Sequence, residues 1–186
     1  IMIASHIVLA IQELVSREIP FNEGAVVTIC QFQGGNTYNA VPGTVELKGT
    51  MRSFSNKSRE FLKLRLPELV SHTAGAYRGS AELEWACDVP VLVNDQRLTE
   101  LFVETLEKMA DGRFPVYEMP ASTGSEDFAV IADKVPAFMF NLALPDEKSE
   151  IQYNLHNPKI RFDEEFIPAG AAALAECAVK WLSENA

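Results

Sequence analysis

The residues with the clearest capacity for chemistry lie in three short polar segments. They are residues 34–42 (GGNTYNAVP), 122–128 (STGSEDF) and 155–158 (LHNP). The last segment places His156 between an apolar run and the start of a helix, and the proline that follows restricts the backbone. A neutral imidazole held in this way is a suitable metal ligand. The alternative is that His156 is an ordinary loop or capping residue.

The small number of histidines limits whether a metal site can be predicted from residue spacing alone. The sequence has three histidines, and a catalytic zinc needs at least three protein ligands. None of the spacings H-E-x-x-H, H-x-E and C-x-x-C occurs. We expect His6 and His72 to lie on helices and to be structural or solvated. Spacing therefore does not establish a metal site.

Other polar residues suit the binding of an anion. Arg52 ends a predicted strand on its polar face, where its planar guanidinium could bind a carboxylate; the alternative is a weak surface ion pair with Glu46. Gly124 and Ser125 precede a predicted helix, and a helix N-terminus is a natural anion site. Simple N-capping by Ser125 explains the same residues equally well.

Composition favours a globular protein with no polyanionic partner. The 186 residues are 47% hydrophobic and 23% charged, enough for one or two domains, and the net charge is −10. This charge argues against nucleic acid and anionic membrane as partners. Residues 1–89 hold 8 basic and 9 acidic residues, whereas residues 90–186 hold 8 and 17. This asymmetry predicts a boundary near Pro90.

Cysteine usage and the first residues bear on location. The three cysteines are far apart, so we expect reduced thiols in a cytoplasmic protein. The apolar start is too short to span a bilayer and has no signal-peptide pattern. The chain opens inside a periodic pattern, as a cut or incomplete chain would.

The first half predicts an incomplete ferredoxin-like unit. Periodicity indicates a helix at residues 3–15, strands at 25–32, 44–52 and 80–86, and a helix from Asn56 that Pro67 should kink or restart. A strand in front of Ile1 would complete the β-α-β-β-α-β plan.

The second half predicts part of an α/β domain. We expect a helix with the stripe 98–109, capped by Asn94 and stopped by Gly112, and a short helix from Ser125. A short strand is expected at 114–117, a doubly buried strand at 136–144 and a final helix at 168–182. His156 should lie in a loop at the carboxyl end of the strand at 136–144, where ligands collect in parallel sheets.

Four segments in order carry a family resemblance. They are residues 34–42, 48–52 (KGTMR), 125–128 (SEDF) and 155–158. On these motifs the chain resembles the C-terminal part of the M20 metallopeptidase/amidohydrolase family. The nearest branch is that of hippurate hydrolases, N-acyl-amino-acid amidohydrolases and indole-acetyl-amino-acid hydrolases. The similarity runs over the whole chain.

The resemblance implies a fold and a division of the chain. Residues 1–89 would form a ferredoxin-like lid and dimerisation domain that lacks its first strand. Residues 90–186 would form the C-terminal part of an α/β metallohydrolase catalytic domain. A homodimer through the lid is expected.

The resemblance also implies a site. His156 matches a ligand of a two-metal centre of zinc, manganese or nickel. Asn39 matches a lid residue that meets the substrate, and its amide could donate to an oxyanion or a carboxylate; the alternative is a turn residue. The family's other ligands and its general-base Glu are not in this sequence. No catalytic residue is therefore assigned, and we expect the chain alone to bind metal poorly and to be inactive.

One difference from the family pattern favours the amidohydrolase branch. Some members carry an Arg for the substrate carboxylate at the end of the last lid strand, where this chain reads Cys87-Asp88-Val89-Pro90. The expected activity is thus hydrolysis of N-acyl amino acids or small peptides rather than glutamate release. The alternative is a non-catalytic ferredoxin-like dimerisation or interaction module.

Overall fold

The computed structural model describes residues 1–112, 114–143, 153 and 155–185. The chain forms two compact units. Unit 1 comprises Ile1–Leu92 and Pro120–Val130, and unit 2 comprises Val93–Met119 and Ile131–Ala186. No helix in the described ranges is both long enough and apolar enough to cross a bilayer.

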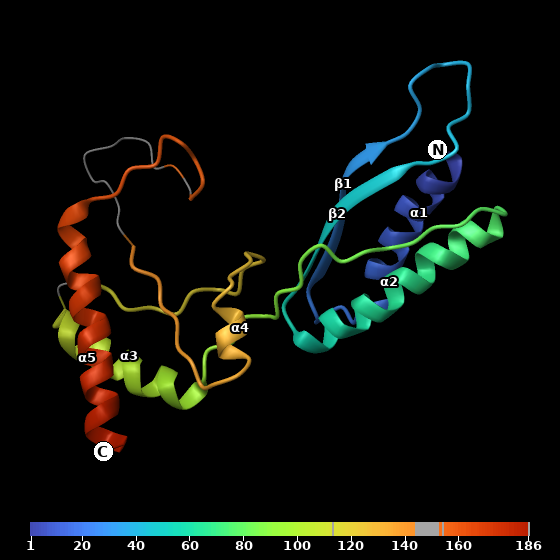
Figure 1. Cartoon of the computed structure of the whole chain (residues 1–186). Helices are drawn as coiled ribbons and strands as arrows, with labels where there is room; N and C mark the ends of the chain where they lie inside the picture. Colours follow the sequence, from blue (N-terminus) through green and yellow to red (C-terminus); the bar gives the residue numbers. More distant parts are fainter. Residues whose placement is uncertain (113, 144–152, 154, 186) are drawn as a thin grey trace. The chain divides into compact units, whose positions relative to one another are not determined.

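Unit 1 is built on an antiparallel hairpin (Figure 1). Strand β1 (Ala25–Gln33) pairs with β2 (Glu46–Ser53), as the alternating sequence predicts. The register shifts between Ile29 and Gln31, which leaves an extra residue on β1 in the manner of a bulge.

Two helices cover the hairpin of unit 1. They are α1 (Met2–Glu13), continued by the π-helical turn η1 (Leu14–Glu18), and α2 (Asn56–Ala76). The apolar stripe predicted for the first helix is confirmed as core. The buried cluster consists of Ile7, Ile11, Leu14, Val27, Leu62, Leu66, Val70 and Ala74. Burial of each large member stabilises the fold by about 1.5–3 kcal/mol.

Helix α2 is longer than the sequence suggested. Its cap is Ser55, whose hydroxyl accepts from the Ser58 amide at 3.1 Å. The sequence predicted a kink or a restart at Pro67; the restart is wrong, because one helix runs through that residue, and the kink stays a prediction. Proline removes one backbone donor, but the neighbouring Leu66 and Val70 are buried, and this packing outweighs the lost bond.

The predicted strand at 80–86 is not formed. Its burial does alternate, since Ala81 and Leu83 pack against the core while Glu82 and Glu84 are exposed. A strand needs a hydrogen-bonded neighbour, however, and the sheet in the described part of unit 1 contains β1 and β2 alone. Residues 80–86 therefore have the alternating burial of a strand but no hydrogen-bonded partner strand in the described part of unit 1.

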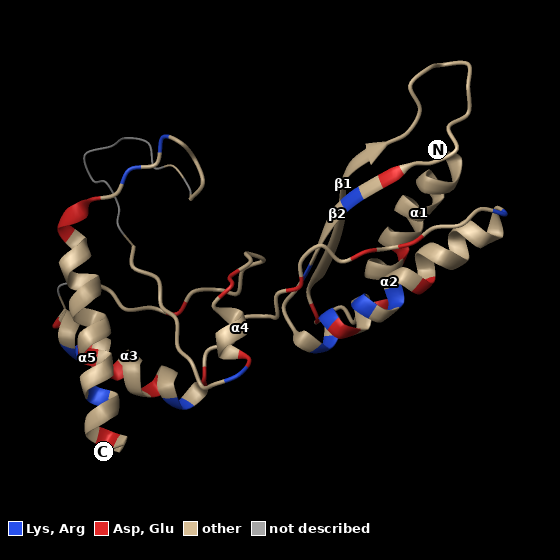
Figure 2. Cartoon of the chain, viewed as in Figure 1, with Lys and Arg blue, Asp and Glu red and all other residues tan. Residues whose placement is uncertain are grey.

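An ionic contact fixes the following residues to α2. Asp88 accepts from Lys63 Nζ at 2.6 Å and from the Arg59 guanidinium, and the Val91 amide donates to Asn56 Oδ1 at 3.0 Å. The hydrogen bond from Lys63, followed by the one from Arg59, lowers the pKa of the Asp88 carboxyl. Figure 2 shows the basic residues on this half of α2.

Unit 2 contains α3 (Gln96–Ala110) packed with α5 (Ile167–Asn185), which follows the 3-10 turn η2 (Glu164–Phe166). The cap of α3 is Asp95, one residue after the predicted Asn94, and it accepts from the Leu98 amide at 2.9 Å. The predicted stop at Gly112 is confirmed, since that residue has φ 70°.

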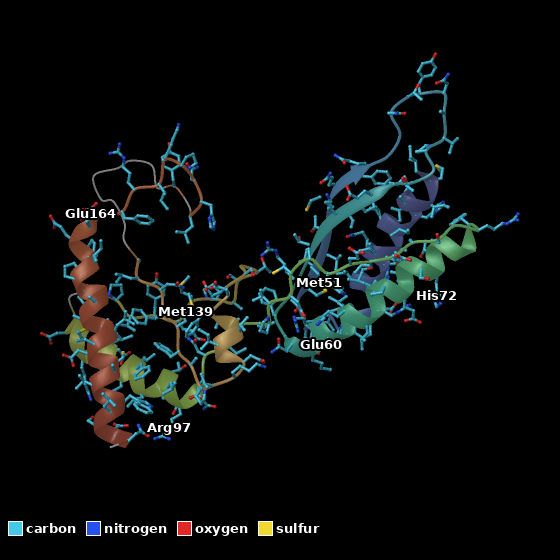
Figure 3. The ribbon with its side chains drawn as sticks, viewed as in Figure 1. Met51, Glu60, His72, Arg97, Met139 and Glu164 are labelled. Atoms are coloured by element: carbon cyan, nitrogen blue, oxygen red, sulfur yellow. The ribbon has the colours of Figure 1, made fainter. Side chains whose placement is uncertain are left out.

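Two further predicted strands are absent. Residues 114–117 form no strand, and neither do residues 136–143; Leu144 lies outside the described residues. Instead, the side chain of Asn94 forms hydrogen bonds with the backbone of residue 139, as a neighbouring strand would. Its Nδ2 donates to the Met139 carbonyl at 2.8 Å, its Oδ1 accepts from the Met139 amide at 2.9 Å, and the Asp95 amide donates to the Ala137 carbonyl at 2.8 Å. Figure 3 labels Met139 in this segment.

The Asn94 amide should therefore be important for the stability of unit 2. Asn94→Ala leaves both backbone groups of the partly buried Met139 without their partner, so the free energy of unfolding should fall by about 1–3 kcal/mol. Urea unfolding followed by Trp181 fluorescence, in a Trp85→Phe background, measures this. The exposed Asn22→Ala serves as the control and should change stability by less than about 0.5 kcal/mol. Equal effects of the two changes would refute the role.

Candidate functional site

The loop that joins β1 and β2 carries Asn39 on a braced backbone (Figure 1). Gly35 has φ 78°, a conformation that glycine adopts without strain. A Cβ on Gly34 would lie 2.7 Å from Val45 Cγ2, and one on Gly35 would lie 3.6 Å from Pro42 Cγ. The two sides of the loop therefore meet closely at its base.

The side chain of Asn39 is exposed but held. The Thr37 hydroxyl donates to Asn39 Oδ1 at 2.8 Å. The neighbouring Tyr38 is fully exposed and leaves the amide accessible. Asn39 is thus a turn residue whose amide also faces solvent, which is compatible with both interpretations of the sequence.

Arg52 meets a segment that lies 71 positions further along the chain. Its guanidinium donates to the Thr123 carbonyl, next to Gly124 and Ser125. The alternative of an ion pair between Arg52 and Glu46 is wrong, because Glu46 pairs with Lys48 at 3.3 Å. Arg52 therefore contacts, within unit 1, the segment that carries Gly124 and Ser125.

Gly124 and Ser125 are not at a helix N-terminus. Helix α4 (Ala129–Ala132) begins four residues after Ser125, and a turn at residues 127–128 precedes it. The Glu126 carbonyl accepts from the Ala129 amide at 3.1 Å. Both the helix-dipole anion site and the capping role of Ser125 are thus wrong. The polar residues 122–127 instead favour a turn, because Ser, Thr and Asp side chains that cap helices also form the local hydrogen bonds of turns.

Asn39 lies at the opposite end of the hairpin from Arg52. Gln33 pairs with Glu46 at the loop end, and Val26 pairs with Arg52 near the other end. The two pairs are six positions apart along β2, so roughly 20 Å of strand lies between them. One small molecule cannot contact both side chains of the same subunit.

His156 lies in a turn of unit 2 with an exposed side chain and φ 71°. This left-handed conformation is uncommon for a residue with a Cβ, though histidine is enriched in it. The Asn157 carboxamide accepts from the Lys159 amide at 2.9 Å and closes the next turn. The prediction that His156 follows the end of a strand at 136–144 is wrong, because the described residues 136–143 do not form a strand.

The other histidines are structural or solvated, as predicted. The His6 ring stacks on Tyr77 with 4.4 Å between centroids. His72 is exposed on α2, as Figure 3 shows.

A metal centre is not complete in the described residues. Within the ranges that the structure describes, no three His, Cys, Asp or Glu side chains form a group that could hold a metal ion. His156 has the right donor chemistry, but one imidazole is too few for a zinc site. The described residues therefore do not by themselves fit a metal centre.

Thr37 is the residue that sequence reasoning missed. A hydroxyl two positions before Asn39 is within reach of its side chain, and Asn and Thr commonly form such local bonds. The contact between Arg52 and Thr123 had no comparable local signal, because it depends on the tertiary fold.

Comparison with known proteins defines the class. A family model described as "Peptidase family M20/M25/M40" matches residues 5–180. This is most of the chain, and the chain belongs to that family.

Particular relatives are hydrolases of acylated amino acids by name. The chain is 31% identical to "IAA-amino acid hydrolase ILR1-like 6" of Arabidopsis thaliana, covering 100% of this chain and 40% of the relative. It is 29% identical to "N-acetyl-L-cysteine deacetylase" of Bacillus subtilis, covering 98% and 42%. The chain therefore spans less than half the length of these relatives.

Solved structures agree with the family. A structure described as that of "a putative aminohydrolase from methicillin resistant Staphylococcus aureus" superposes with a TM-score of 0.85 at 30% identity, covering 96% of this chain and 45% of that one. The YXEP protein of Bacillus subtilis, described as a dinuclear metal binding peptidase of the M20 family, gives 0.77 at 26% identity, covering 98% and 46%. The α/β arrangement of a small sheet with helices thus has counterparts in this family.

Proposed function

We propose that this chain supplies the lid and the C-terminal catalytic segment of a metal-dependent hydrolase. Its substrates would be N-acyl amino acids or small peptides, whose amide bond is cleaved to a free acid and an amine. The match to the family over residues 5–180 carries this proposal. The relatives named as an amino acid hydrolase and a deacetylase support the substrate class.

The site would be shared between this chain and sequence beyond its 186 residues. His156 would supply one ligand of a centre of two divalent ions, zinc, manganese or nickel. When bound, such ions polarise the amide carbonyl and activate water. Asn39 would donate from its amide to an oxygen of the substrate, and Arg52 with the backbone at Gly124 and Ser125 would shape a second polar contact.

A homodimer through the ferredoxin-like lid is part of the proposal. Residues 1–89 would form this lid, and residues 90–186 would belong to the catalytic domain. The separation of roughly 20 Å along β2 supports an arrangement in which Asn39 serves the site of the partner subunit. A cytoplasmic location is proposed from the cysteine usage.

A non-catalytic dimerisation or interaction module is the second candidate. It is favoured by the lack of any metal-holding group of three side chains in the described residues. Such a module would keep the hairpin and its helices and would need no metal.

Hydrolysis assays on two proteins separate the candidates. The 186-residue chain should release no amino acid from hippurate or N-acetyl amino acids, because the resemblance assigns one metal ligand, His156, to it and a catalytic zinc needs at least three. The complete protein, stripped with a chelator and reloaded with Mn²⁺, Zn²⁺ or Ni²⁺, should hydrolyse at least one substrate. Metal-dependent turnover by the short chain would contradict the shared site, and an inactive complete protein would favour the module.

A further inference from the structure

The orientation of the Asn39 amide decides what that residue can recognise. An asparagine side chain presents an oxygen acceptor at one end and an NH₂ donor at the other, and the two ends have nearly the same shape. The Thr37 hydroxyl donates to Oδ1 at 2.8 Å. Because Oδ1 and Nδ2 diverge from one carbon atom, this bond leaves Nδ2 facing away from Thr37.

The outward end is available. No residue in the described part of the chain forms a hydrogen bond with Asn39 Nδ2, and the side chain is exposed. The backbone beneath it is held where Gly34 meets Val45 and Gly35 meets Pro42. The loop therefore presents two N–H donors on the side of the amide that faces away from Thr37.

We propose that Thr37 is a positioning residue that orients the Asn39 amide with its donors toward the substrate. The inference rests on the proposed function, in which Asn39 meets a carbonyl oxygen that gains negative charge or a carboxylate. Both groups accept hydrogen bonds. A reversed Asn39 amide would place its Oδ1, also an acceptor, next to the substrate oxygen, and the two would repel each other. A donor already oriented needs no reorganisation when the charge develops.

The matched test removes the hydroxyl and keeps the shape. In the complete metal-loaded hydrolase, Thr37→Val should lower kcat by roughly 3- to 10-fold with little change in KM, since one modest hydrogen bond is lost. Thr37→Ser keeps the donor and should restore kcat to within about 2-fold. Thr44→Val makes the same change in the same exposed loop and should leave kcat unaltered.

Coupling to Asn39 distinguishes positioning from loop stability. In an Asn39→Ala background, Thr37→Val should have no further effect on kcat, because the group that it orients is gone. An equal loss in both backgrounds would overturn the proposal. Melting temperatures of all variants should agree within about 2 °C, since the bond is local and exposed.

A second readout does not depend on catalysis. In the 186-residue chain, the Asn39 NH₂ resonances, identified by their loss in Asn39→Ala, should show a higher ¹⁵N–¹H NOE than those of the exposed Asn36. Thr37→Val should reduce the NOE of Asn39 to the level of Asn36, whereas Thr44→Val should not. Equal NOE values in the unsubstituted chain would refute an oriented amide.

The outcomes separate the two claims. If Asn39→Ala keeps its kcat, the proposed contact of Asn39 with substrate fails, and the NOE alone decides whether Thr37 orients the amide. If Asn39→Ala lowers kcat but Thr37→Val behaves like Thr44→Val, the positioning role is refuted while the contact of Asn39 stands.

Discussion

In the proposed complete hydrolase, Asn39→Ala should lower kcat by about 10²–10³-fold and change KM much less. The expected loss is that of one donor aimed at charge that develops in the transition state. Such a donor contributes little to binding the neutral ground state, so its removal acts mainly on kcat. Steady-state kinetics on an N-acyl amino acid, with metal content measured for each sample, give both constants.

Asn36→Ala is the control for the loop. Asn36 is exposed and lies in the same segment, three positions before Asn39, so its removal tests whether any change in the loop affects turnover. We expect near-normal kcat for Asn36→Ala. If Asn39→Ala has normal kcat and a lowered melting temperature, Asn39 is only a turn residue, as its bond to Thr37 would also allow.

The helices and the hairpin could be predicted because their signals are local. The stripe containing Ile7 and Ile11 identifies the buried face of α1, and the alternation in residues 44–52 identifies β2. These elements also satisfy one another, since the hairpin closes its own ladder and the helices cover it. Periodicity is sufficient where the partner of an element is near in sequence.

The strands at 80–86 and 136–144 show where periodicity fails. Ala81 and Leu83 have the alternating burial of a strand, and Phe138 packs edge-on against Phe102 with 5.4 Å between centroids. Burial of one face follows from composition, but a ladder needs another strand alongside. At Met139 the carboxamide of Asn94 occupies that place, which no pattern of hydrophobic residues could predict.

The candidate site divides in the same way. The role of Asn39, drawn from its glycine-rich loop and the family motif, stays a prediction, whereas the contact of Arg52 with Thr123 depends on the tertiary fold. The error at Ser125 arose because Ser followed by acidic residues is typical of helix starts and of turns alike. Helix propensity could not decide between them, and α4 begins only at Ala129.

His156→Ala should reduce the metal affinity of the complete hydrolase by about 10–100-fold, with a matching loss of turnover at limiting metal. The imidazole of His156 is exposed in its turn and makes no hydrogen bond within the described residues, so a metal ion would compete with no internal partner. Its backbone has φ 71°, and an unusual conformation held by the fold is frequent at functional positions.

His72→Ala is the matched control, because His72 is also exposed and lies on α2. Metal content after dialysis against a graded chelator should fall in His156→Ala and stay at the level of the unsubstituted protein in His72→Ala. Full metal content and normal turnover in His156→Ala would make His156 an ordinary turn residue. The family assignment would survive that result, because it rests on residues 5–180 rather than on one side chain.

The two inactive variants together test whether Asn39 serves its own subunit. In a mixed dimer of Asn39→Ala with His156→Ala, one site keeps its own His156 and receives Asn39 from the partner. If Asn39 acts across the dimer, one of the two sites in each mixed dimer is complete. Each mixed dimer should then have up to about half of the activity of the unsubstituted dimer. If Asn39 acts within its own subunit, each site lacks one residue and mixing restores nothing. Asn39 and Arg52 lie at opposite ends of β2, so we expect restoration if Arg52 serves the same site as His156 of its own subunit.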